Sequence, residues 1–231
     1  MKAVFKKVIA TILEAESRAV LKRFKPSVIA VTGSVGKTST KDAVFTAFSG
    51  FVQARKSEKS FNSEIGVPLT ILGLKNAWSD PIAWTINIFQ GLKVIFGFTT
   101  YPKWVVLEVG ADRPGDIKKI ASWVKPHMVV LTRLPNVPVH VEYFSSPQKV
   151  VEEKLSLVDS LQKGGTVIAN GDDPLIIDGV KKRGVSMLTY GFSEGVTVRA
   201  ETYEVVYEKK DERRYPIGFS MKISSGGESF F

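Results

Sequence analysis

The sequence predicts an α/β protein of three layers, in which a mostly parallel sheet carries helices on both faces. Short apolar runs rich in β-branched residues alternate with stretches of helical periodicity, as in residues 27–32 followed by 37–48. Strands separated by helices favour a parallel sheet, because each connection must cross one face to return. From Val196 onward apolar and polar residues alternate instead, which predicts antiparallel hairpin material at the end of the chain.

Five short apolar runs are the predicted strands of this sheet. Each is rich in valine, isoleucine or leucine, a pattern typical of buried strands. The runs cover residues 27–32, 104–109, 128–132, 166–169 and 186–190. Connecting helices are expected at residues 37–48, around 117–124 and at 150–161. A charged turn is expected at residues 208–214.

Residues 1–26 are expected to form an N-terminal amphipathic helix, ahead of the main domain over residues 27–231. Residues at helical spacing and flanked by lysines are Val4, Phe5, Val8, Ile12, Ala15 and Ala19. Glu14, Glu16 and Arg18 interrupt the apolar stretch, which argues against a secretory signal. Such a helix binds either the protein core or a membrane surface, and we favour packing on the domain.

A second apolar stretch, residues 81–98, is marginal in length for a membrane span. Polar residues and glycines interrupt it at Gln90, Gly91, Lys93 and Gly97. We therefore expect a helix on the surface of the domain or at a membrane interface.

Composition restricts the class of protein. The 231 residues are 44% hydrophobic and 24% charged, which is the profile of a globular protein with a core. The absence of cysteine excludes disulfides and thiolate metal sites, and it allows the cytoplasmic location that we expect. The net charge of +9 favours an anionic ligand or surface. Because the basic residues are spread along the chain, nucleic acid is not an expected partner.

The strongest functional signal is a glycine loop between the first strand and the first helix. Backbone N–H groups at a helix N-terminus bind phosphate, and the sequence around Lys37 and Thr38 is that of a P-loop, in which the lysine contacts the outer phosphates and the hydroxyl binds Mg²⁺. Val31 stands where the usual first glycine would be, so a plain strand-to-helix turn is the alternative. The predicted nucleotide-binding residues are Gly33, Ser34, Val35, Gly36, Lys37, Thr38 and Ser39.

Two charged residues lie at positions predicted to be buried. Glu108 ends an apolar strand, where a carboxylate is costly unless it is paired or binds a metal. Lys154 lies on the apolar stripe of its helix, together with Val150 and Leu161. Burial lowers the pKa of a lysine and exposes a nucleophilic amine. The alternatives are an ion pair for Glu108 and, for Lys154, a side chain that extends from the edge of the core to water.

Five segments in order resemble the Mur ligases, which build the stem peptide of peptidoglycan. The resemblance spans about residues 27–193. The segments are residues 31–41 (VTGSVGKTSTK), 60–70 (SFNSEIGVPLT), 107–116 (LEVGADRPGD), Glu153 with Lys154, and 170–174 (NGDDP).

This resemblance implies an ATP-dependent ligase that joins a carboxylate to an amine. In that family ATP converts the carboxylate to an acyl phosphate, which the amine then attacks to form an amide. The motifs most resemble those of the member that adds D-alanyl-D-alanine to UDP-N-acetylmuramoyl-tripeptide. The implied cofactors are therefore ATP and Mg²⁺, and the implied partners are these two substrates.

The resemblance also implies roles for individual residues. Thr38, Glu108, His140 and Lys154 correspond to Mg²⁺ ligands, the lysine after carbamylation, and hard oxygen ligands suit that ion. Lys37, His140 and Lys154 are the implied catalytic residues. Asn62 lies in the segment that contacts the UDP-sugar substrate, although a turn asparagine is the alternative. Residues 132–140 differ from the T-N-x-G segment usual in the family, and His127 is expected to be structural.

Two other functions remain open from the sequence. One is another ligase of the same superfamily, such as one that adds glutamate to folate. The other is a noncatalytic nucleotide-binding module held at a membrane by residues 1–24 and 81–98. The adenine-contacting helix and the C-terminal domain usual in the family are not found in the sequence, so ligation is expected to need a further domain or a partner chain.

Overall fold

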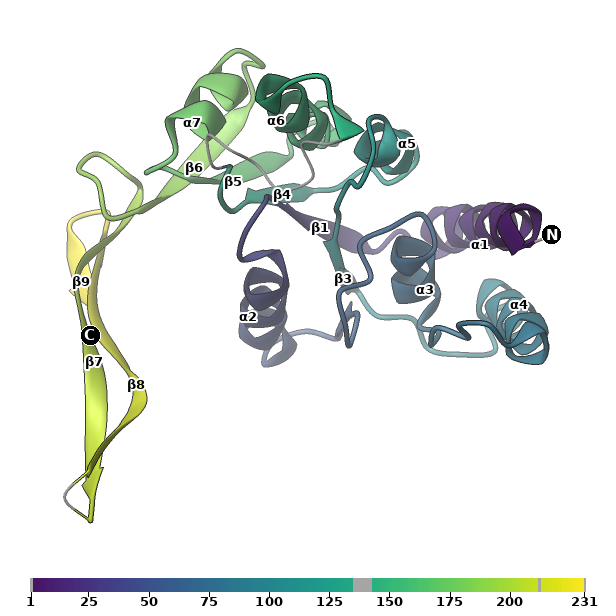
Figure 1. Cartoon of the computed structure of the whole chain (residues 1–231), viewed down its shortest axis with the longest axis horizontal. Helices are drawn as coiled ribbons and strands as arrows, with labels where there is room; N and C mark the ends of the chain where they lie inside the picture. Colours follow the sequence, from purple (N-terminus) through teal and green to yellow (C-terminus); the bar gives the residue numbers. More distant parts are fainter. Residues whose placement is uncertain (1, 135–142, 212, 231) are drawn as a thin grey trace.

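The centre of the protein is one nine-stranded sheet, seen in a computed structural model that describes residues 2–134, 143–211 and 213–230 (Figure 1). The strands lie in the order β2-β3-β1-β4-β5-β6-β7-β8-β9. All neighbours from β2 to β7 are parallel, whereas β7 and β8, and then β8 and β9, are antiparallel. The bounds are β1 Ser27–Thr32, β2 Ala54–Lys56, β3 Trp104–Glu108, β4 Met128–Leu131, β5 Thr166–Asn170, β6 Ser186–Gly191, β7 Val198–Lys210, β8 Arg213–Ser225 and β9 Glu228–Phe230.

Both faces of the sheet are covered around β1. Alternate residues of a strand point to opposite faces, so Val28 and Ala30 of β1 join one core cluster and Ile29 and Val31 join another. Helix α2, Lys37–Ser49, covers the second cluster, and its Val44, Phe45 and Phe48 pack against these strands.

The first face carries the other helices and the larger core. Their bounds are α1 Lys2–Phe24, α3 Gly66–Leu72, α4 Pro81–Ile95, α5 Asp116–Ala121, α6 Pro147–Leu155 and α7 Pro174–Lys181. Every residue of α3 is buried, and α1 packs against both α3 and α4 (Figure 1). A short 3-10 helix, Val158–Ser160, follows α6.

The predicted three-layer fold is confirmed. All five predicted strands form within one or two residues of their expected ends. The helix expected at 150–161 instead begins at Pro147 and ends at Leu155, and α4 occupies the apolar stretch expected to be a surface helix. Helices α3 and α7 and the short strand β2 were not predicted.

Helix α1 packs on the domain as favoured, but the predicted apolar stripe is not the face it buries. The buried apolar residues are Ile9, Ala10, Leu13 and Val20, whereas Val4 and Val8 are 68% and 49% exposed. The helix therefore has apolar residues on both sides, and the periodicity in the sequence identified the side that is exposed. The division into residues 1–26 and 27–231 stays a prediction, although α1 shares the main core.

Strands β7 and β8 form a long hairpin that projects from the body of the protein (Figure 1). Apart from a few residues near its base, this hairpin is exposed on both faces, and it confirms the antiparallel material predicted after Val196. Within the described residues, no helix has the length and apolar character needed to cross a membrane.

Candidate functional site

The glycine loop follows the carboxyl end of β1 and leads into α2. Strand β1 lies between β3 and β4, so the strand order reverses at β1. Open α/β sheets bind ligands at the carboxyl ends of the strands beside such a reversal. Gly33 and Gly36 have φ angles of 150° and 83°, values that L side chains rarely adopt. A built Cβ on Gly36 would meet no heavy atom of the described residues within 4 Å.

The end of β4 holds the loop in this shape. Thr132 Oγ1 donates to the carbonyl of Val35 at 2.7 Å, and the N–H of Ser34 donates to the carbonyl of Arg133 at 2.7 Å. A Cβ on Gly33 would collide with the Thr132 hydroxyl, so only glycine permits this close approach. This role of Thr132 was not predicted, and its only signal in the sequence is its place at the end of a predicted strand.

Lys37 lies across the loop, with its Nζ donating to the carbonyl of Ser34 at 3.2 Å. The Oγ of Ser34 is buried and has no hydrogen-bond partner among the described residues. A buried hydroxyl without a partner is costly. The loop thus combines a lysine amine with a free hydroxyl at the N-terminus of a helix, a combination that suits an anionic ligand.

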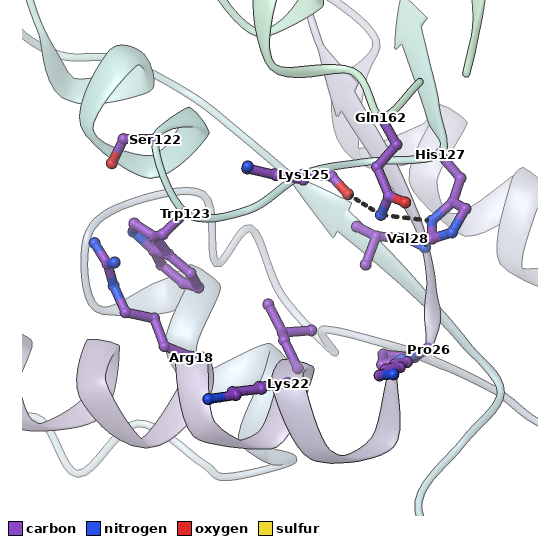
Figure 2. Close-up of a pocket in the computed structure, with 11 residues that line it drawn as sticks. Arg18, Lys22, Pro26, Val28, Ser122, Trp123, Lys125, His127 and Gln162 are labelled. Atoms are coloured by element: carbon purple, nitrogen blue, oxygen red, sulfur yellow. Dashed lines mark hydrogen bonds between the residues drawn. The ribbon is translucent and has the colours of Figure 1, made fainter. Parts of the chain in front are cut away.

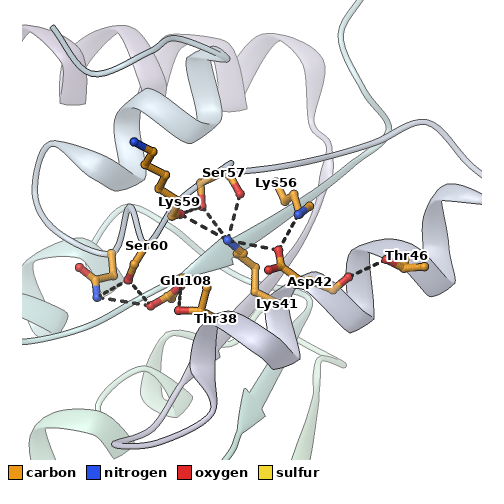
Figure 3. A network of polar contacts seen from close by, with 10 residues as sticks. Thr38, Lys41, Asp42, Thr46, Lys56, Ser57, Lys59, Ser60 and Glu108 are labelled. Carbon is orange, nitrogen blue, oxygen red and sulfur yellow. Dashed lines mark hydrogen bonds and ion pairs between the residues drawn. The ribbon is translucent and has the colours of Figure 1, made fainter. Parts of the chain in front are cut away.

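Glu108 is 1% exposed and lies where three predicted site segments meet (Figure 3). Its Oε2 accepts a hydrogen bond from Thr38 Oγ1 at 2.9 Å, and its Oε1 accepts one from Ser60 Oγ at 2.6 Å. Asn62 Nδ2 lies 3.2 Å from Ser60 Oγ and 3.4 Å from Glu108 Oε1. The structure therefore brings Thr38, Glu108 and Asn62 together. Among the described residues, hydroxyls and the Asn62 amide contact Glu108, and the basic partner considered from the sequence does not.

A fully buried lysine that was not predicted from the sequence packs behind this cluster. Lys41 is 0% exposed, and its Nζ donates to the Ser57 carbonyl at 2.9 Å and to the Lys59 carbonyl at 3.3 Å (Figure 3). The Ser57 hydroxyl and Asp42 lie 3.3 and 3.4 Å from the same amine. These bonds fix the segment that carries Ser60 against α2.

Lys154 is buried on α6, as its helical spacing predicted, with 6% exposure. Burial, and then repulsion from Lys37, lower the pKa of Lys154 to about 8, against smaller opposing effects of Glu153 and Asp112. The neighbouring Glu153 accepts hydrogen bonds from the N–H groups of Gly115 and Ile117 at 2.9 and 2.8 Å. It therefore stabilises the start of α5, while Lys154 lies within electrostatic range of the phosphate loop.

The structure tests the prediction for one of the two histidines, His127, and not that for His140. His140 lies outside the described residues, so its predicted metal and catalytic roles stay predictions. His127 Nδ1 accepts a hydrogen bond from the N–H of Val28 at 3.1 Å, at the opposite edge of the sheet from the phosphate loop. This contact confirms the structural role expected for His127.

A divalent cation fits the donors at this edge of the sheet. Glu108 and Thr38 already hold oxygen atoms within 2.9 Å of one another, and oxygen donors are what Mg²⁺ prefers. Among the described residues no three histidine, cysteine or acidic side chains gather to hold a metal. A cation here would therefore depend on one carboxylate, one hydroxyl and further oxygen donors from elsewhere.

Comparison with known proteins agrees with this geometry. Residues 85–226 match the family described as the Mur ligase middle domain. UDP-N-acetylmuramoyl-tripeptide--D-alanyl-D-alanine ligase of Bacillus subtilis is 29% identical over 166 residues, covering 72% of this chain and 31% of the relative. The chain thus spans about a third of the length of that curated relative.

Solved structures show the same fold. The MurF crystal structure from Acinetobacter baumannii has a TM-score of 0.70 at 18% identity, covering 95% of this chain and 40% of that one. MurF ligase from Thermotoga maritima in complex with ADP has a TM-score of 0.68 at 21% identity, covering 96% and 43%. With the family match extending over more than half of its residues, the chain belongs to the Mur ligases, and the matched part is their middle domain.

Proposed function

We propose that this chain is the nucleotide-binding domain of an ATP-dependent amide ligase of peptidoglycan precursor synthesis. The observation that carries the proposal is the bond between Thr38 and Glu108, at 2.9 Å, beside an open glycine loop at a helix N-terminus. It joins a loop suited to phosphate with a buried carboxylate suited to a divalent cation. The ADP complex of the Thermotoga maritima relative supports a nucleotide as the ligand.

In this proposal residues 33–39 hold the phosphates of ATP. The backbone N–H groups of the loop and of the first turn of α2 donate to the phosphate oxygens. The amine of Lys37 leaves the Ser34 carbonyl, which is 3.2 Å away, and contacts the outer phosphates instead. The chain thereby orients the terminal phosphate and offsets its negative charge, which is the main task of a protein in phosphoryl transfer.

Thr38 and Glu108 would hold Mg²⁺, joined by a carbamylated Lys154 and by His140. When bound, the ion neutralises phosphate charge and polarises the group that is transferred. Lys154 suits carbamylation because its lowered pKa of about 8 leaves part of the amine neutral near pH 7. A carbamate would change a buried cation into an anionic oxygen donor, which also removes the repulsion from Lys37.

The proposed substrates follow from the names of the relatives. The Bacillus subtilis protein is a ligase of UDP-N-acetylmuramoyl-tripeptide and D-alanyl-D-alanine, and we assign the same two compounds to the complete enzyme of which this domain is the nucleotide-binding part. Asn62 lies within 3.4 Å of Glu108 and would contact the carboxylate substrate. The amine substrate would need a further domain or a partner chain.

Calorimetric titration with a nonhydrolysable ATP analogue, with and without Mg²⁺, tests the proposal. We expect the Lys37→Ala variant to bind at least about tenfold more weakly, because a charge-assisted contact is lost. Glu108→Gln should remove most of the dependence on Mg²⁺. Lys163→Ala, an exposed lysine at the opposite edge of the sheet, is the matched control and should bind as the wild type does. Unchanged affinity in Lys37→Ala would contradict the assignment.

A further inference from the structure

Helix α1 presents an apolar face to solvent in addition to the one it buries. Val4, Phe5 and Val8 are 68%, 44% and 49% exposed, and they share one side of the helix with the exposed Ala15. The opposite side is already occupied, because Leu13 is fully buried in the main core. A large part of the apolar surface of Val4, Phe5 and Val8 is therefore left outside the packing of this fold.

Helix α4 has the same two-sided character. Its inner face is buried through Trp84, Gly91 and Val94. Residues at helical spacing on the opposite face are large, apolar and 51–73% exposed, and Phe98 just beyond the helix is 77% exposed. They are Ile82, Ile86, Phe89 and Phe96. Exposed apolar residues that gather in a patch usually mark an interaction site.

The two helices lie side by side at one end of the molecule (Figure 1). A Cβ on Gly91 of α4 would collide with the carboxylate of Glu16 on α1, and one on Gly97 would lie 2.7 Å from Arg23. The two helices are therefore in direct contact, and the exposed face of α4, opposite Gly91, points away from α1. We name the exposed apolar residues of both helices the α1–α4 surface: Val4, Phe5, Val8, Ala15, Ile82, Ile86, Phe89 and Phe96.

The two segments that carry this surface are net positive. Residues 1–26 carry seven lysines and arginines against two glutamates, and residues 81–103 carry two lysines and no acid, in a chain of net charge +9. Beside α1, a cavity of about 640 Å³ is lined by cations and by Trp123, with no acidic residue in its lining (Figure 2). Those cations are Arg18, Lys22, Lys25 and Lys125.

We propose that the α1–α4 surface binds an anionic lipid bilayer. Helices with aliphatic and aromatic residues on one face and lysines beside them insert that face into the headgroup region of a membrane. The concentration of positive charge favours an anionic surface, since each lysine or arginine near such a bilayer adds to binding. A neutral protein partner or a second copy of this basic chain would not exploit that charge.

Sedimentation with vesicles tests this proposal in the full chain. Wild type should bind vesicles of phosphatidylcholine with phosphatidylglycerol, and bind phosphatidylcholine alone much more weakly. The double variant Ile86→Ser with Phe89→Ser should lower binding by about tenfold or more. The matched control is Ile217→Ser with Phe219→Ser on β8, where the same residue types are 61% and 69% exposed, and it should bind as the wild type does.

A variant with fewer positive charges and a measurement of nucleotide affinity test the proposal further. Lys7→Gln with Lys93→Gln should weaken binding to anionic vesicles and reduce its salt dependence, while nucleotide affinity stays at the wild-type value in all variants. The proposal is overturned if wild type binds neither kind of vesicle, if it binds both equally, or if the β8 variant loses as much binding as the α4 variant. Self-association of the wild type that the α4 variant abolishes, without vesicle binding, would assign the surface to a second copy instead.

Discussion

The phosphate-loop edge of the sheet and the α1–α4 surface both carry positive charge, but they hold it differently. At the loop edge Lys41 and Lys154 are buried, with 0% and 6% exposure, and Lys41 is held by several oxygen atoms. At the α1–α4 surface the cations are exposed, and the buried charged group is Glu16, whose carboxylate has no partner among the described residues. Fixed and buried charge suits one small ligand of defined shape, whereas mobile charge on an exposed surface suits a large and adaptable one.

Replacing Lys41 with methionine should have the largest effect on stability, because it breaks the buried network at the loop edge. Methionine leaves the carbonyls of Ser57 and Lys59 without their donor, and removing one partner of a buried charged network costs about 3–5 kcal/mol. We expect the free energy of unfolding, measured in urea, to fall by about this amount, together with nucleotide affinity. Lys56→Met is the control, since Lys56 lies nearer the surface and its ion pair with Asp42 is partly exposed, and it should cost less than about 1 kcal/mol.

Replacing Lys154 at the same edge should change stability in the opposite direction, because burial of Lys154 disfavours its charged form. Its pKa of about 8 lies below the ordinary value of 10.5. In metal-free protein the cationic form destabilises the fold fully below about pH 8, and the cost disappears as pH rises to 10.5. Lys154→Met should therefore raise the free energy of unfolding by about 2–3 kcal/mol at pH 7 and should abolish ligation by the complete enzyme. A stability difference from wild type that stays constant between pH 7 and pH 10.5 would contradict this account.

Lys154, Lys41, Thr38 and Glu108 also show how far the sequence could predict the site. Lys154 was predictable, because its own helix places it on an apolar stripe. Lys41 was not, because its acceptors lie 16 and 18 residues away along the chain and meet it only after β2 has added to the edge of the sheet. Thr38 and Glu108 were predicted through their motifs, but their direct contact depends on the pairing of β1 with β3.

The fold was predictable wherever a segment carries a single apolar pattern that is compatible with only one buried face or one type of element. The buried strands of the parallel sheet have such a pattern, and all five were found. Helix α1 has apolar residues on both sides, so periodicity gave the helix and could not decide which face is buried. Helix α7 was not predicted, although its sequence carries a usable signal: Asp173 caps its first N–H groups and Pro174 is its first residue.

Replacing Glu16 should give the smallest change in the free energy of unfolding and the clearest dependence of that change on pH. Burial raises its pKa from 4.5 to about 7, so the carboxyl binds a proton more tightly in the folded than in the unfolded protein. Its contribution to stability is fully present below about pH 4.5 and is lost as pH rises through 7. Glu16→Gln removes the charge but leaves a buried amide, so we expect a gain of about 2 kcal/mol in the free energy of unfolding at pH 8 and little change at pH 4.5. Urea denaturation at both pH values measures this, and an equal effect at each would show that Glu16 meets a cation or water that neutralises it, which would make the α1–α4 surface resemble the loop edge.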